Sequence, residues 1–124
     1  MSRRIDDPTW RRVREGRQSI EPLLARERVV DGIRAFFKAR GFHEVETPLM
    51  VRHPGMEPHL EVFRTDLATA RGRRAEAYLT TSPEYAMKKL LAAGLERIFQ
   101  LCKAFRNREE VSSRHNPEFT ILEW

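Results

Sequence analysis

The sequence predicts an α+β fold in which an antiparallel sheet is flanked by helices on one face. Three observations predict it. A helical pattern of apolar residues at about 22–40 precedes the strand-like segments. A second helical segment, at about 82–93, interrupts them. Two β-rich runs, 98–105 and 118–124, flank a polar loop and indicate a long-looped antiparallel hairpin.

Length and composition fit a globular protein. The 124 residues are enough for one domain or part of one, and 40% are apolar while 33% are charged. No apolar run approaches the roughly 20 residues that span a bilayer, and the N-terminus lacks the apolar segment of a secretory signal. The one cysteine, Cys102, excludes an internal disulfide, and we expect it to be a small buried apolar group. We therefore expect a cytoplasmic protein with no membrane partner.

The charge is positive and unevenly distributed. A net charge of +5 favours a polyanionic partner such as ATP, RNA or an acidic protein. Residues 1–20 hold six arginines against three carboxylates and lack a convincing apolar stripe. We expect residues 1–20 to form a loosely packed basic N-terminal arm with at most a short helix. A solvated arm and an RNA-binding arm both fit this composition.

The first long helix has start and stop signals. Ser19 offers an N-cap, and Pro22 suits the first turn. Gly41 supplies a left-handed stop. Between them, apolar residues recur at spacings of three and four on one face: Leu23, Val30, Ile33 and Phe37. These signals predict a helix at about 22–40.

Short extended segments follow. Residues 42–48 suit a strand that ends at Pro48, because proline disfavours the helical region for the residue before it. Residues 52–59 contain two prolines and a glycine and should form a loop. Residues 60–67 suit a strand, and residues 68–77 suit a turn with a basic tip. Extended structure is expected to return at Tyr78 and Leu79.

The second helix is marked by its first three residues. Ser82, Pro83 and Glu84 fit an N-cap, a first helical residue and an acidic first turn. Gly94 is expected to end the helix. Capping alone would account for all three N-terminal residues.

The hairpin loop, residues 106–115, contains the residues that point most clearly to a ligand. It contains three arginines, two carboxylates and a histidine, which are costly to bury and must meet water or a charged ligand. Arginine presents a planar fork to phosphate oxygens. Phe119 on the next strand offers a ring on which a base could stack, worth about 1–3 kcal/mol. These residues indicate a nucleotide site, although a solvated hairpin can have the same composition.

The loop and the first helix resemble two motifs of a known family. The order Phe105, Arg106, Glu109, His115, Phe119 resembles motif 2 of the class II aminoacyl-tRNA synthetases. Residues 41–48, with the helix before them, resemble motif 1, which ends in a proline. Residues 114–120 are similar to the lysyl branch of this family. Residues 54–60 and 81–85, with Glu123 and Trp124, are similar to its paralogue that ligates lysine to elongation factor P.

The resemblance implies how the chain is organised. Residues 21–124 correspond to the N-terminal part of a class II catalytic domain, with motifs 1 and 2 present and motif 3 absent. Only about 20 residues precede the motif 1 helix, so the anticodon-binding domain of a lysyl-tRNA synthetase is missing. This favours the elongation factor P ligase over the tRNA ligase. We expect the 124-residue chain alone to lack activity.

The resemblance also implies a reaction and its residues. Lysine or β-lysine would be activated with ATP as an adenylate and passed to a lysine side chain of elongation factor P. Arg106 would be the catalytic cation on the α-phosphate. The implied ATP-binding residues are Arg106, Asn107, Glu109, His115 and Phe119. The implied substrate-binding residues are Ser82, Pro83, Glu84, Asn116 and Glu123. No metal ligand is implied here: Mg²⁺ would be held by the missing C-terminal part. A homodimer through motif 1 is implied as well.

Two other functions stay open. One is a lysyl-tRNA synthetase that charges tRNA, and the other is a non-catalytic remnant or basic RNA- or protein-binding module. The sequence departs from the family pattern Arg-Asn-Glu, because Arg108 stands between Asn107 and Glu109. We treat it as an inserted residue. Which lysine isomer is used is also open.

Overall fold

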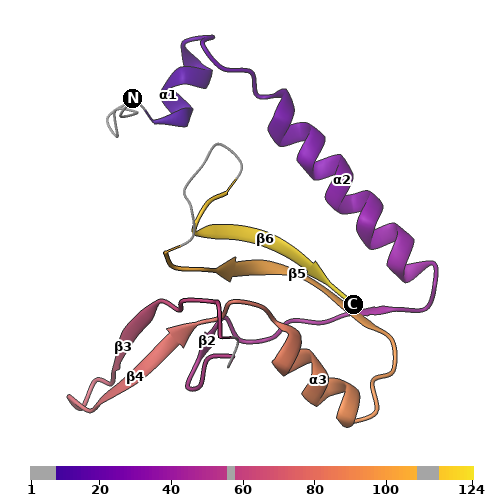
Figure 1. The fold of residues 1–124 in the computed structure, drawn as a ribbon. Coiled ribbons are helices and arrows are strands. Elements are labelled where there is room, and N and C mark those ends of the chain that lie inside the picture. The colour runs from indigo at the N-terminus through magenta and orange to yellow at the C-terminus, as the bar shows by residue number, and fades with distance from the viewer. Residues whose placement is uncertain (1–7, 56–57, 109–114) are drawn as a thin grey trace. The chain divides into compact units, whose positions relative to one another are not determined.

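The computed structural model describes residues 8–55, 58–108 and 115–124. The chain divides into two compact units, Met1–Ala39 and Arg40–Trp124. Helices α1 and α2 belong to the first unit, and all the strands and helix α3 belong to the second (Figure 1). The boundary expected at residue 20, between a basic arm and a catalytic domain, stays a prediction.

The first unit contains the predicted long helix. Helix α2 spans Glu21–Lys38, which confirms the helix expected at about 22–40. The Ser19 hydroxyl oxygen accepts a hydrogen bond from the Glu21 N–H at 3.1 Å, as a capping residue does. Gly41, just beyond the helix, has the left-handed φ of 76° expected of a stop. Helix α1, Thr9–Arg14, is the short helix expected within the first 20 residues.

The main sheet of the second unit has the strand order β1-β5-β6. Strands β5 (Ile98–Phe105) and β6 (Glu118–Glu123) pair antiparallel from Gln100↔Glu123 to Phe105↔Glu118. This confirms the predicted hairpin, whose two strands run side by side in Figure 1. Strand β1, only His43–Glu44, pairs with β5 in parallel. The α+β class is confirmed, but the sheet expected to be antiparallel is mixed, because the long connection from β1 to β5 returns the chain in the same direction.

A second sheet has the order β2-β4-β3, and both pairings are antiparallel. Its strands are β2 (Met50–Val51), β3 (Arg64–Ala68) and β4 (Arg74–Leu79). The turn expected over 68–77 is much shorter, because Thr69 N–H bonds to the Arg73 carbonyl and closes a tight hairpin. The described chain thus forms two sheets, where the sequence suggested one.

Helix α3, Glu84–Ala92, confirms the second predicted helix, and Gly94 follows it with a φ of 102°. The core of the second unit lies at β5 and α3. Its buried apolar side chains are Ala77, Met87, Ile98, Phe99 and Ala104. Cys102 is only half-buried, so the expectation of a buried residue was wrong. In the described part of the chain, no helix is both long and apolar enough to cross a membrane.

Candidate active site

One face of the β5–β6 hairpin gathers the candidate residues. Side chains alternate along a strand, so Phe119, Ile121 and Glu123 of β6 share a face. The register places Ala104, Cys102 and Gln100 of β5 opposite them. Phe119 and Glu123 are four residues apart, which is about 13 Å along a strand. The face therefore has two ends, one at Phe119 and one at Glu123.

Arg106 and Phe119 form the first end. The guanidinium carbon of Arg106 lies 5.1 Å from the centroid of the Phe119 ring. The Arg106 N–H donates to the Pro117 carbonyl at 2.9 Å, so main-chain pairing continues past the end of β5 and fixes Arg106 there. The two side chains lie together, as the sequence suggested. A fixed cation beside an aromatic ring suits a ligand that carries both phosphate and a base.

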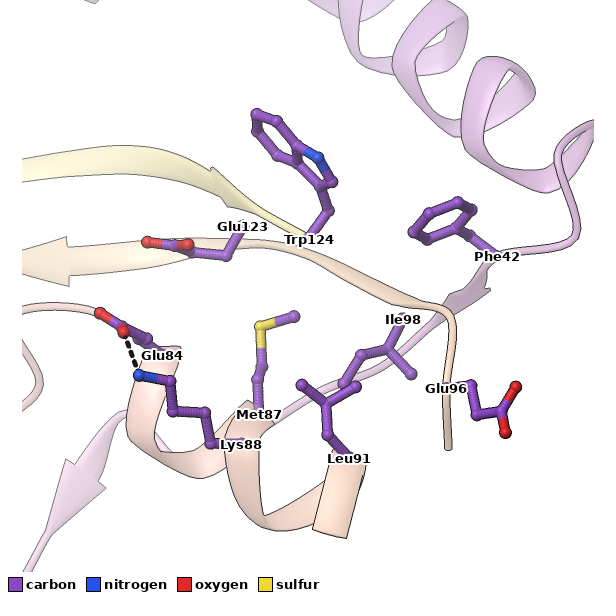
Figure 2. Close-up of a pocket in the computed structure, with 9 residues that line it drawn as sticks. All are labelled: Phe42, Glu84, Met87, Lys88, Leu91, Glu96, Ile98, Glu123 and Trp124. Atoms are coloured by element: carbon purple, nitrogen blue, oxygen red, sulfur yellow. Dashed lines mark hydrogen bonds and ion pairs between the residues drawn. The ribbon is translucent and has the colours of Figure 1, made fainter. Parts of the chain in front are cut away.

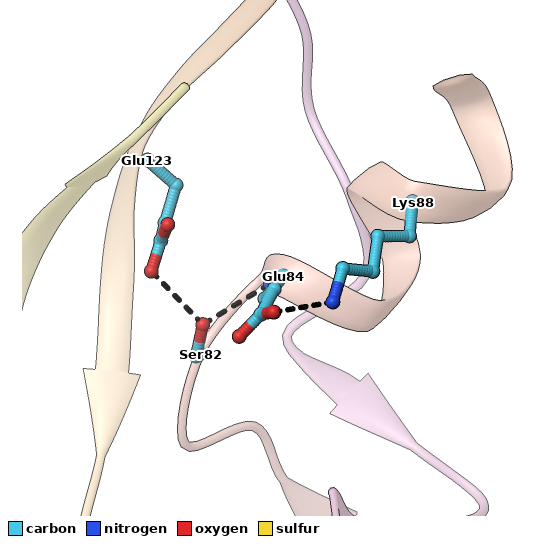
Figure 3. Close-up of polar contacts among 4 residues, drawn as sticks. All are labelled: Ser82, Glu84, Lys88 and Glu123. Atoms are coloured by element: carbon cyan, nitrogen blue, oxygen red, sulfur yellow. Dashed lines mark hydrogen bonds and ion pairs between the residues drawn. The ribbon is translucent and has the colours of Figure 1, made fainter.

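Ser82, Glu84 and Glu123 form the second end (Figure 3). The Ser82 hydroxyl donates to Oε1 of Glu123 at 3.2 Å and accepts from the Glu84 N–H at 3.1 Å. Pro83, between them in the chain, is fully buried. The hydroxyl thus caps α3 and positions a carboxylate of β6. The structure brings these four predicted substrate residues to one place.

Glu84 is already engaged by a cation. Lys88 Nζ lies 2.6 Å from Oε1 of Glu84, one helical turn away. This hydrogen bond, more than the charge of Glu84, raises the pKa of Lys88. Glu123 has no ion pair within the described part of the chain, so it is the carboxylate of this group that can receive a cation. The spacing of four residues between Glu84 and Lys88 is the signal in the sequence for this ion pair.

A cavity of about 440 Å³ adjoins the second end (Figure 2). Glu84, Lys88 and Glu123 line one part of it, and Glu96 lies at its rim. The remaining wall is apolar and consists of Phe42, Met87, Leu91, Ile98 and Trp124. An apolar wall with a carboxylate suits an alkyl chain that ends in an ammonium group. Sequence reasoning did not identify the apolar wall, whose residues come from four separate segments.

Gln100 is a further polar group on this face that sequence reasoning missed. Its side chain is 2% exposed, and its Oε1 has no hydrogen-bond partner among the described residues. It stands opposite Glu123 in the register. A buried acceptor without a donor is unusual in a folded protein and points to a ligand that supplies one. The only signal in the sequence was a polar residue in an otherwise apolar run.

Cys102 lies on the same face but is not poised as a nucleophile. Burial raises the pKa of its thiol, a hydrogen bond from Gln100 opposes that rise, and the charge of Glu123 adds to it. The thiol is therefore neutral at physiological pH, and a neutral thiol is a weak nucleophile.

The remaining predicted residues lie around the hairpin loop. The Asn107 N–H donates to the Glu61 carbonyl, and Asn107 Oδ1 accepts from the Arg108 N–H. Arg108 has a φ of 54°, so the residue that we treated as inserted takes a left-handed conformation. His115 and Asn116 are exposed just before β6. Glu109 lies outside the described residues.

A metal site is not evident in the parts that the structure describes. Residues 8–55, 58–108 and 115–124 contain no group of three or more His, Cys, Asp or Glu side chains that could hold an ion. The expectation that Mg²⁺ ligands lie elsewhere stays a prediction.

Known proteins resemble this chain over most of its length. Residues 9–124 match the family "tRNA synthetases class II (D, K and N)". A protein of Actinobacillus succinogenes is 50% identical over 107 residues, and one of Pasteurella multocida is 52% identical over the same number. A Histophilus somni protein is 51% identical. All three are named elongation factor P–(R)-β-lysine ligase, and each match covers 86% of this chain and 33% of the relative. The chain thus spans about a third of the length of these curated relatives.

Proposed function

The chain belongs to the class II tRNA synthetases of the D, K and N family, and from this premise we propose that its protein activates lysine or β-lysine with ATP and ligates it to elongation factor P. The acceptor would be a lysine side chain of that factor. The names of the relatives support this choice of substrates. The observation that carries the proposal is the β5–β6 face, where Arg106 meets Phe119 at one end and Ser82 meets Glu123 at the other.

The two ends match the order of groups in an aminoacyl adenylate. Such a molecule has an ammonium-bearing side chain at one end, a phosphoryl group in the middle and a base at the other end. Glu123 and the cavity beside it suit the side chain. Phe119 suits the base, and Arg106 beside it suits the phosphoryl group. About 13 Å of strand separates the two ends.

The first chemical step needs positive charge at the phosphoryl group. A carboxylate oxygen of the amino acid bonds to the α-phosphorus while the bond from that phosphorus to the pyrophosphate oxygen breaks. Negative charge grows on the α-phosphoryl oxygens, and the Arg106 guanidinium would oppose it. Mg²⁺, when bound, would neutralise the polyphosphate further. In the second step the acceptor amine attacks the acyl carbon, AMP leaves, and the amine loses a proton.

The amino-acid end would select a cationic substrate. Glu123 offers a carboxylate, which the Ser82 hydroxyl orients. Gln100 offers a second acceptor on the same face. Two acceptors can receive the two ammonium groups of lysine or β-lysine. Which isomer is preferred depends on where the second ammonium group lies relative to Gln100.

Amino-acid-dependent ATP–pyrophosphate exchange tests the proposal. We would measure it on the chain and on its fusion to the remaining two-thirds of the Pasteurella multocida relative, with L-lysine, D-lysine and both β-lysine isomers. The fusion should exchange with a lysine isomer, and Arg106→Ala should reduce the rate by roughly 100-fold or more. Arg64→Ala, which removes an exposed arginine of β3, is the matched control. A folded fusion without exchange, or one indifferent to Arg106→Ala, would refute the proposal.

The alternatives give different outcomes in a second assay. Transfer of labelled amino acid to elongation factor P supports the ligase, whereas transfer to tRNA identifies a lysyl-tRNA synthetase. A fusion that binds neither ATP nor lysine would favour the non-catalytic remnant or basic binding module. A homodimer through motif 1 and a cytoplasmic location belong to the same proposal.

A further inference from the structure

Strand β4 has one edge that is only partly paired with another strand. Strand β3 pairs with it along its length, from Ala68↔Arg74 to Arg64↔Tyr78. Strand β2 covers the other side only at Tyr78 and Leu79. From Arg74 to Ala77, no strand of the described chain lies on that side.

The main-chain groups on this side are those of Arg74 and Glu76. Leu79 N–H donates to the Phe63 carbonyl and Thr69 N–H donates to the Arg73 carbonyl, so the odd-numbered residues of β4 bond toward β3. Because the bonding direction alternates along an antiparallel strand, Arg74 and Glu76 present N–H and C=O groups to the open side. Such an edge is a template for an added strand.

A basic cavity of about 590 Å³ lies beside this edge. Arg52 and His53, where the chain leaves β2, line it together with Arg73, Arg74 and Glu76 of the hairpin, and Leu67, Thr69 and Ala75 complete the lining. The single carboxylate in this lining, Glu76, lies 3.3 Å from Arg64 and is neutralised by it. Among the residues that the structure describes, no carboxylate pairs with the side chains of Arg52, Arg73 or Arg74. The cavity therefore carries unbalanced positive charge.

We propose that this edge and cavity bind an extended acidic segment of a partner protein, which adds to β4 as a strand. Its main chain would pair with Arg74 and Glu76, and its carboxylates would meet Arg52, Arg73 and Arg74. No Phe, Tyr or Trp side chain lines the cavity, and the imidazole of His53 alone is a small platform for stacked bases, so single-stranded RNA fits less well. A second copy of the same edge would bring like charges together. The proposal stands independently of the proposed function.

Binding of a fluorescent ten-residue peptide that alternates Glu with Val or Thr tests the charge contribution. By anisotropy, Arg52→Ala and Arg74→Ala should each weaken binding roughly threefold. The triple variant R52A/R73A/R74A should weaken it roughly tenfold or more. Arg71→Ala, which removes a charge at the hairpin tip outside the cavity, should change it by less than about twofold. An equal effect of Arg71→Ala and Arg52→Ala would overturn the proposal, as would tighter binding of an RNA ten-mer.

A proline variant tests the main-chain contribution. Glu76→Pro removes an N–H on the open side and leaves the β3–β4 hydrogen bonds in place. It should abolish peptide binding while the circular dichroism spectrum is unchanged. Glu76→Ala removes the same charge but keeps the N–H, so it should bind at least as tightly as the wild type. A folded Glu76→Pro variant that binds like Glu76→Ala would overturn strand addition.

Discussion

Ser82 links two elements of the candidate site with one hydroxyl group, which both caps α3 and orients Glu123. Ser82→Ala removes both hydrogen bonds and should lower the free energy of unfolding by about 1 kcal/mol. Ser82→Thr keeps the hydroxyl and should lose less than half of that. Urea denaturation of the three proteins measures the difference. Equal stability of Ser82→Ala and wild type would contradict this role.

Cys102 should titrate above the range of an ordinary cysteine, because burial raises the pKa of its thiol. A raised pKa in the folded state means that the stability it contributes is present below the ordinary cysteine pKa and is lost as pH rises through the folded value. Iodoacetamide should therefore react with the folded protein with a midpoint at higher pH than with the urea-unfolded protein. Coincident midpoints would contradict the assignment.

At this scale the sequence was informative where a motif existed. The approach of Arg106 to Phe119 followed from their places in a hairpin motif, and Ser82 followed from helix capping. The burial of Gln100 and the ion pair between Glu84 and Lys88 did not follow from any motif. Burial of Gln100 depends on how β5 packs, and a single glutamine carries no mark of it. The ATP and substrate roles of all these residues stay predictions.

Two glycines, one inside a helix and one just after a helix, should respond to alanine substitution in opposite ways. Gly32 lies within α2, and an added Cβ would meet no atom within 4 Å. Gly32→Ala should therefore stabilise the protein by about 0.8–1 kcal/mol. Gly94 follows α3 and has a φ of 102°, so Gly94→Ala should lower the free energy of unfolding by about 1 kcal/mol or more. Thermal unfolding of both variants measures the two changes in stability. Changes in the same direction would contradict this expectation.

Elements with local signals were predicted, and those that depend on distant pairing were not. Helices α2 and α3 have caps, apolar periodicity and glycine stops, and the β5–β6 hairpin has two long β-rich runs. Strand β1 pairs with β5 across more than fifty residues, and its parallel direction has no local signature. Strand β4 begins at Arg74, directly after Arg73, and this pair of arginines suggested a turn. Both are exposed, so pairing with β3 costs them no desolvation.

At the scale of the whole molecule, helix α2 carries several exposed apolar side chains. Leu23 and Val29 are each 60% exposed, and Phe36 is 49% exposed. Exposed apolar side chains on one helix favour association, so we expect a dimer in which this helix is buried. Val29→Glu should shift sedimentation equilibrium toward the monomer, whereas Asp31→Ala, a polar position on the same helix, should not. A monomeric wild type at high concentration would contradict the expectation.

Family membership was inferred from two motifs in order, and the comparison with known proteins confirmed it. The arrangement of strands in two sheets was not foreseen, since the family resemblance fixed the order of elements but the sequence did not reveal each pairing. The chain covers 33% of the length of its Pasteurella multocida relative, and the complete two-step reaction is a proposal.

Equilibrium binding of ATP to the 124-residue chain tests the central claim most directly, because the Arg106–Phe119 pair lies wholly within it. Isothermal titration should show ATP binding that Arg106→Ala and Phe119→Ala each weaken by roughly tenfold or more. The control Arg64→Ala should bind within about twofold of the wild type. Equal affinity of Arg106→Ala and Arg64→Ala for ATP would contradict the account.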